Sequence, residues 1–302
     1  MTLLIGSLQL GFIYGILALG VYITFRILNV PDLTAEGSFT CGVAISAVLT
    51  MAGHPWLGMV LAAAGGAAAG ICTGLLQTKA GIHPILSGIL TMSGLYSINL
   101  LIMGSSSNLT LLGSDTAFQL LIDRLGMNKE AVRALLSLVL CAGCTAVLSW
   151  FFKTHTGLCI RATGDNEDMV RASSINVETT KILALAIGNG CIALSGGILA
   201  QYQGFADINS GVGILVVGLA SVIIGEAIWG RRSVTIGLIS AVVGSVIYRY
   251  IIAAALRTDI FPSYFLKLIS ACIVAIALSL PELKRRRELS AMKKRGKKHA
   301  GH

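Results

Sequence analysis

The sequence predicts an all-α protein, a polytopic bundle of transmembrane helices with about eight to nine hydrophobic segments. Of its 302 residues, 55% are hydrophobic and only 12% are charged, whereas a soluble domain carries about 25% charged residues. The mean hydropathy is +0.80. The apolar runs are long and unbroken, which suits helices of about 20 residues rather than barrel strands of about 9–11 residues.

Nine apolar runs follow one another along the chain, separated by short polar, Gly- or Pro-containing boundaries. The second run is short for a full crossing. The third carries Gly66, Gly70 and Gly74, and this four-residue spacing lets helix backbones approach closely. The runs are Leu3–Leu28, Gly37–Ala52, Trp56–Leu76, Pro84–Met103, Ala134–Phe152, Ile182–Ala200, Val212–Ile228, Val234–Leu256 and Phe261–Leu280.

Lysine and arginine residues gather on one side of the membrane if the nine runs alternate across it. Arg26, Lys79, the loop at 153–181 and the C-terminal tail then share a side, which the positive-inside rule makes cytoplasmic. The N-terminus and the polar connector at 105–132 fall outside. We therefore expect a multi-pass protein of the plasma (inner) membrane with its N-terminus outside and its C-terminus in the cytoplasm.

The chain ends in a basic tail at 282–302, with nine lysines and arginines and two acids. No aromatic residues are interleaved with these charges, so we interpret the tail as a cytoplasmic anchor on anionic lipid rather than as a nucleic-acid-binding segment. Residues 1–281 are expected to form the membrane domain.

Signatures of an enzyme or a metal site are missing from the sequence. It contains no GxxxxGK[ST] phosphate-binding loop, and its five histidines are scattered. Cys141 and Cys144 form a CxxC pair within an apolar run, where small buried residues are the expected role. Glu226, four residues before a Gly-Arg-Arg sequence, is expected to pair with Arg231 or reach the interface. We therefore expect a non-enzymatic protein without a metal or cofactor of its own.

A set of polar residues at or within the runs forms a candidate solute path: Asp32, Glu36, Asn99 and Asn189. Asp32 and Glu36 are four residues apart, so on a helix they would share a face, and ionisable groups at the edge of a span often mark a water-filled path. The alternative is that both acids are solvated in a cytoplasmic turn. Asn99 and Asn189 would alternatively bond neighbouring helices.

The polar segment at 153–181 interrupts the apolar runs in the middle of the chain. It predicts a short helix at 167–173 with Asp165 or Asn166 as its N-cap and acids in its first turn. Such a helix would offer a soluble partner a docking surface. The alternative is a solvated connector with incidental charge.

Two stretches resemble the permeases of ABC importers of the branched-chain amino acid type, a broad family that also includes ribose and nucleoside permeases. One is Tyr14–Val43, which is similar to the family's opening span and the segment after it. The second lies in the central loop and consists of Gly157, Arg161-Ala162-Thr163-Gly164, Asp165-Asn166, Arg171-Ala172 and Ser174-Ile175-Asn176-Val177. Ser174 replaces a more usual Gly, and the segment at 29–39 is more acidic than in most branched-chain amino acid members.

The resemblance implies a permease domain at 1–281 whose loop at 153–181 forms a cytoplasmic coupling helix seated on a separate ATPase subunit, which binds the ATP. Gly157 and Gly164 would permit turns. Contacts with the ATPase would involve Arg161, Ala162, Asp165, Asn166 and Arg171. An extracytoplasmic binding protein would deliver the solute, and a permease homodimer would enclose the path along its two-fold axis. Relatives with a single permease sequence include some that move aromatic amino acids.

The main alternative is a secondary transporter driven by an ion gradient. That class predicts ionisable residues deep within the spans and inverted repeats. The middles of the runs are nearly free of charge, and no repeat is evident in the sequence. The favoured interpretation is therefore the permease subunit of an importer for a small polar, amino-acid-like solute.

Overall fold

Helices form about four fifths of the described part of the chain. The computed structural model describes residues 2–126, 128–230 and 233–257, together with the single residues 268, 271, 272 and 275. The elements in chain order are α1 (Thr2–Tyr22), the π-helix η1 (Ile23–Ile27), α2 (Thr34–Met51), α3 (Pro55–Thr78), α4 (Pro84–Ile102), β1 (Asn108–Thr110), α5 (Ala117–Leu125), α6 (Lys129–Phe151), α7 (His155–Asp165), α8 (Glu167–Ala172), α9 (Val177–Gln203), β2 (Phe205–Asp207), α10 (Ile214–Trp229) and α11 (Val234–Arg257).

Six of the nine expected runs form helices long and apolar enough to cross a membrane: Leu4–Ile27, Pro55–Thr78, Pro84–Ile102, Lys129–Phe151, Val177–Gln203 and Val234–Ala255. The second run forms α2, which is 18 residues long but carries Glu36 in its first turn. The seventh forms α10, which has 16 residues. The run at 261–280 lies almost entirely outside the described residues, as does the basic tail. The all-helical membrane fold is confirmed, and the count of eight to nine segments stays a prediction.

Local sequence explains where the helices begin and end. Pro55 and Pro84 stand in the first turns of α3 and α4, where a missing backbone N–H does no harm. The side chain of Asn176 accepts hydrogen bonds from backbone N–H groups at the start of α9. Gly204 ends α9 with a φ of 78°, a conformation that favours glycine.

Helix α9 lies at the centre of the bundle, where it contacts α1, α2 and α3. Its partner α3 presents the predicted row of glycines to it. A methyl group at Gly70 would overlap the carbonyl oxygen of Leu185, and one at Gly74 would lie 2.9 Å from Cα of Ile182. The glycine spacing is thus confirmed as a close-packing face.

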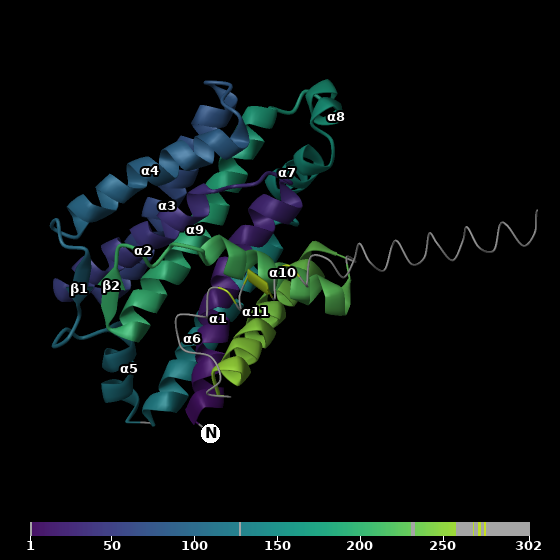
Figure 1. Cartoon of the computed structure of the whole chain (residues 1–302). Helices are drawn as coiled ribbons and strands as arrows, with labels where there is room; N and C mark the ends of the chain where they lie inside the picture. Colours follow the sequence, from purple (N-terminus) through teal and green to yellow (C-terminus); the bar gives the residue numbers. More distant parts are fainter. Residues whose placement is uncertain are drawn as a thin grey trace, which may run out of the picture.

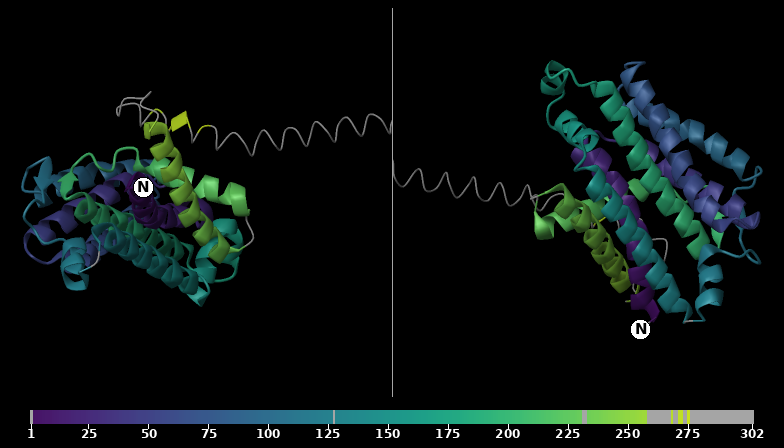
Figure 2. Two further views of the ribbon diagram at one scale, coloured as in Figure 1. Left: turned by 90° about the horizontal axis from the view of Figure 1, so that it is seen from below. Right: turned by 180° about the vertical axis from the view of Figure 1, so that it is seen from behind.

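The bundle has two distinct ends (Figure 1). Helices α7 and α8 lie at one end, and the N-terminus and α5 lie at the other, which the view from behind also shows (Figure 2). Gln9 of α1 donates a hydrogen bond of 2.8 Å to the carbonyl oxygen of Glu130, at the start of α6. Strands β1 and β2 join distant segments, pairing Asn108 with Asp207. The segments expected on opposite sides of the membrane therefore lie at opposite ends.

Candidate functional site

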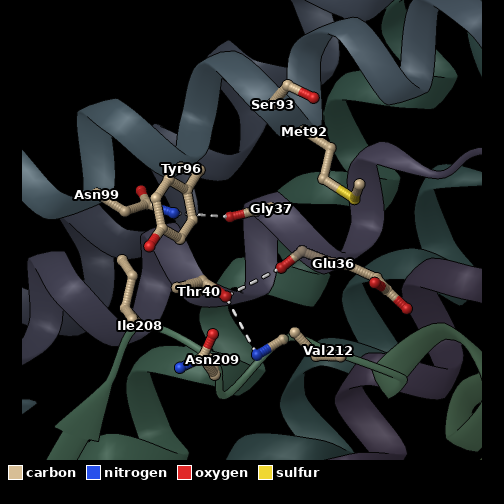
Figure 3. A pocket seen from close by; sticks show the side chains of 11 residues that line it. Glu36, Gly37, Thr40, Met92, Ser93, Tyr96, Asn99, Ile208, Asn209 and Val212 are labelled. Atoms are coloured by element: carbon tan, nitrogen blue, oxygen red, sulfur yellow. Dashed lines mark hydrogen bonds between the residues drawn. The ribbon is translucent and has the colours of Figure 1, made fainter. Parts of the chain in front are cut away.

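A pocket of about 430 Å³ opens between α2, α4 and the chain that follows β2 (Figure 3). Helix α2 contributes the first turns after its start, α4 contributes its second half, and the third wall is the segment leading into α10. The lining residues are Glu36, Gly37, Thr40, Met92, Ser93, Tyr96, Asn99, Ile208, Asn209, Gly211 and Val212.

The third wall is fixed to α2 by hydrogen bonds. The hydroxyl of Thr40 donates to the carbonyl oxygen of Glu36 at 3.1 Å and accepts from the backbone N–H of Gly211 at 3.1 Å. The backbone N–H of Gly213 donates to Oε1 of Glu36 at 3.0 Å. A methyl group at Gly211 would overlap the carbonyl oxygen of Glu36, so glycine permits this backbone contact.

Asn99 joins the opposite wall to α2. Its Nδ2 donates to the carbonyl oxygen of Gly37 at 3.2 Å, and its Oδ1 is buried without a hydrogen-bond partner among the described residues. Tyr96 stands beside it with 53% of its surface exposed. The pocket therefore combines an aromatic ring, amide and hydroxyl groups and one carboxylate. This chemistry suits a small solute with both polar and apolar parts.

Asp32 and Asn189, the other two candidate path residues, bond to each other instead of lining the pocket. Nδ2 of Asn189 donates to Oδ2 of Asp32 at 2.6 Å, and the backbone N–H of Thr34 donates to Oδ1 at 2.9 Å. The expectation that Asp32 and Glu36 share a helix face is wrong, because α2 begins only at Thr34. Asp32 is buried with 3% of its surface exposed, so it is not solvated in a turn either.

The exposed side chains of α7 and α8 form a second candidate site at the end of the bundle. We call it the docking surface and define it as Leu158, Arg161, Asp165, Asn166, Asp168, Met169 and Arg171, all of which are exposed. Ala162 is half-buried beside them. The predicted helix at 167–173 is confirmed as α8, Glu167–Ala172, and the side chain of its N-cap Asn166 accepts from the backbone N–H of Met169 at 3.0 Å.

The two candidate glycines of this region have a different role from the one predicted. They lie inside α7, which begins after its N-cap Thr154, so the expectation that they permit turns is wrong. A methyl group at Gly157 would lie 2.5 Å from Cα of Phe152, and one at Gly164 would overlap the carbonyl oxygen of Ile27 in η1. Both glycines therefore allow α7 to pack directly on neighbouring backbone.

Side-chain contacts fix the docking surface to the central helix. The hydroxyl groups of Thr163 in α7 and Thr180 in α9 are 2.8 Å apart and buried. Nζ of Lys181 in α9 lies 2.6 Å from Oε1 of Glu167 in α8. Movement of the docking surface must therefore strain contacts with α9 and η1.

Sequence reasoning missed an ion pair near the same end. Arg26 of η1 pairs with Glu226 in the last turn of α10, and their side chains are 24% and 11% exposed. The sequence predicted that Glu226 pairs with Arg231 or reaches the interface, and Arg231 lies outside the described residues. The available signal was that Arg26 and Glu226 are each the single charge of their apolar run.

The chain is similar to known permeases. Residues 3–277 match the family described as the permease component of the branched-chain amino acid transport system. The tyrosine transport system permease protein of Clostridioides difficile (strain R20291) is 39% identical over 94% of this chain and 92% of that protein. An uncharacterised protein of Rickettsia prowazekii (strain Madrid E) is 32% identical over 92% of this chain and 98% of its own length.

A more distant similarity covers part of the chain. The autoinducer 2 import system permease protein LsrC of Enterobacter sp. (strain 638) is 29% identical over 70% of this chain and 59% of that protein. No solved structure matches the chain.

Proposed function

The chain belongs to the family of permease components of the branched-chain amino acid transport system, and from this premise we propose that it moves an amino-acid-like solute across the plasma membrane with energy from a separate ATPase subunit. Membership makes it a multi-pass permease component of an ABC-type importer for amino-acid or sugar-like solutes. The proposal adds the solute, the partners and the orientation.

The main structural support for the proposal is the docking surface. Short helices with exposed charged and apolar side chains stand beyond the spans at one end, and Thr163 and Lys181 join them to α9. A soluble ATPase that grips this surface would apply force to the central helix. Arg161, Asp165, Asn166 and Arg171 supply the polar contacts, and Gly157 and Gly164 let α7 seat closely on the bundle.

The orientation follows from the same assignment. If the docking surface faces the cytoplasm, the N-terminus and α5 face outward, because they lie at the opposite end of the bundle. A binding protein outside the membrane would then deliver the solute at that end. A second copy of the permease completes the path in this proposal, because the sequence shows no internal duplication and the described residues form one docking surface.

The pocket supports an amino acid over a sugar as the solute. Glu36 offers a negative charge, which favours an ammonium group, and Tyr96 and Met92 offer apolar contact for a side chain. The similarity to a tyrosine transport system permease points to the same solute class. We propose that Glu36 and Asn99 border the solute path, whereas Asp32 and Asn189 support the start of α2.

Reconstitution tests the proposal directly. The permease, its ATPase and its binding protein are placed in proteoliposomes, and uptake of labelled L-tyrosine is measured with and without ATP. We expect ATP-dependent uptake, and we expect Arg161→Glu to abolish both ATPase binding and uptake. Arg124→Glu is the control for ATPase binding, since Arg124 is exposed on α5 at the other end. Equal loss of ATPase binding in both variants, or no loss in either, would refute the docking assignment.

A further inference from the structure

Helix α10 is held by a carboxylate at each of its ends. At its start, the backbone N–H of its N-cap Gly213 donates to Oε1 of Glu36 at 3.0 Å. In its last turn, Glu226 pairs with Arg26 of η1. Gly213 and Glu226 are 13 residues apart in sequence, which places these two contacts roughly 20 Å apart along the helix.

The N-terminal end of α10 lies at the wall of the pocket. Glu36 lines the pocket together with Gly211 and Val212, the residues that lead into the helix. Gly211 contacts the carbonyl oxygen of Glu36 so closely that a methyl group would not fit. A shift of α10 along or across its axis must therefore change the third wall of the pocket.

The C-terminal end of α10 is linked, through Arg26 of η1, to the contact between η1 and α7. Arg26 immediately precedes Ile27, whose carbonyl oxygen lies against Gly164 of α7. Arg26 and Glu226 are mostly buried, so separating them would leave two poorly hydrated charges. If α7 moves η1, the ion pair makes the last turn of α10 follow.

These contacts connect η1, α2 and α10 in a closed ring within the bundle. Residues 28–33 join η1 directly to α2, and α10 connects the two again through Glu226 and Glu36. The linker contains Asn29 at a φ of 59°, and η1 is a π-helix. Such irregular segments are often found at functional sites. Helix α10 also packs against α1, since Gly218 contacts Val21.

The geometry points to Arg26 and Glu226 as positioning residues that transmit movement of the docking surface to the pocket through α10. This inference rests on the proposed function and assigns its coupling to a specific pair. Neither residue belongs to the docking surface or lines the pocket. Their substitution should therefore uncouple ATP hydrolysis from transport rather than abolish either binding event.

The test uses the complete importer in proteoliposomes, with L-tyrosine and the binding protein supplied outside. For each variant, tyrosine uptake and ATP hydrolysis are measured in the same vesicles. Glu226→Gln keeps the shape of the side chain and removes its charge. We expect uptake per ATP hydrolysed to fall at least about fivefold while ATP hydrolysis stays within about twofold of the unmodified complex, as an interaction of about 1 kcal/mol implies.

The matched control is Glu178→Gln. Glu178 also forms an ion pair, since Nζ of Lys79 lies 2.5 Å from its Oε2, and the pair joins the C-cap of α3 to α9 outside the ring. We expect this variant to keep the unmodified uptake per ATP. Equal losses in the two variants, or proportional losses of uptake and hydrolysis in Glu226→Gln, would overturn the inference.

Charge reversal supplies a second, independent variant. Arg26→Glu with Glu226→Arg restores an ion pair, and a double-mutant cycle isolates the pair from the effect of each single change. We expect the double variant to recover most of the lost uptake per ATP, including where a single variant fails to assemble. A double variant that assembles and hydrolyses ATP but stays uncoupled would overturn the inference. Absence of ATP-dependent uptake in the unmodified complex would instead contradict the proposed function.

Discussion

Gly164→Ala is the most direct perturbation of the contact between α7 and the bundle. The added methyl carbon would lie 2.9 Å from the carbonyl carbon of Ile27 and 3.1 Å from Cα of Leu28, and closer still to the carbonyl oxygen of Ile27. Ordinary contacts of this kind begin at 3.4 Å. Backbone atoms cannot rotate away as a side chain can, so α7 must retreat by on the order of 1 Å.

The expected cost follows from two opposing effects. Overpacking a well-packed site costs about 1–3 kcal/mol, and the upper half of that range applies because the overlap is with backbone. Replacing glycine by alanine within a helix returns about 1 kcal/mol. A net penalty of about 1–2 kcal/mol on the seated position of α7 corresponds to a loss of roughly 5–30-fold in its population.

The assay is ATP-dependent uptake of L-tyrosine by the reconstituted importer, with thermal unfolding of the permease in detergent as a parallel measurement. Gly143→Ala is the control, because a methyl group there meets nothing within 4 Å on α6. We expect uptake per ATP to fall within the 5–30-fold range for Gly164→Ala and to stay unchanged for Gly143→Ala. Normal coupling in Gly164→Ala would refute the reasoning, since it would show that close seating of α7 is not required.

Three further predictions concern packing, the buried acid and orientation. Gly70→Ala should lower thermal stability by about 1–3 kcal/mol, whereas Gly94→Ala, which has open space around it, should not; equal melting temperatures would contradict this. Asp32→Ala should cost about 1–3 kcal/mol through its two lost hydrogen bonds, and Asp32→Asn less, which the same unfolding assay checks. An impermeant maleimide should label Asp115→Cys on intact cells and Asp168→Cys only after permeabilisation, and the reverse pattern would invert the proposed orientation.

The sequence predicted the helices best where apolar runs meet strong boundary residues. The run at 56–76 became α3, Pro55–Thr78, because a proline starts it and the small-residue face packs on α9. The structure of the polar connector at 105–132 was harder to predict from the sequence. Its strand β1 pairs with β2 about 100 residues later, with Asn108 opposite Asp207. Such a contact is determined by the assembled bundle, and a local pattern carries no signal of it.

At the candidate site too, the sequence indicated some residues, whereas others were revealed only by the folded structure. Glu36 and Asn99 stood out as polar groups within apolar surroundings, and both line the pocket. Tyr96 and Val212 did not, since an aromatic or apolar residue in a membrane span is unremarkable. The role of a glycine is ambiguous for another reason. A glycine such as Gly164 is expected both in a turn and at a close contact between helices, and the sequence alone does not distinguish the two. The backbone of η1 beside Gly164 shows that its role is close helix contact.

Asp32 provides the sharpest test between ATP-driven import and the alternative of an ion gradient. A proton relay needs a carboxylate that reaches the solute path. Asp32 accepts hydrogen bonds from the backbone of Thr34 and from Asn189, and it is not among the described residues that line the pocket. Its position at the start of α2 matches a structural anchor.

The anchor interpretation predicts how transport responds when its energy source changes. Proteoliposomes with an imposed proton gradient and no ATPase should accumulate no L-tyrosine, and adding the ATPase and ATP should restore uptake. Asp32→Asn keeps an oxygen that can accept from Thr34 and loses the titratable proton, so ATP-driven uptake should survive at reduced stability. Accumulation driven by the gradient alone, and lost in Asp32→Asn, would identify Asp32 as a proton carrier and remove the need for a coupling role of α7.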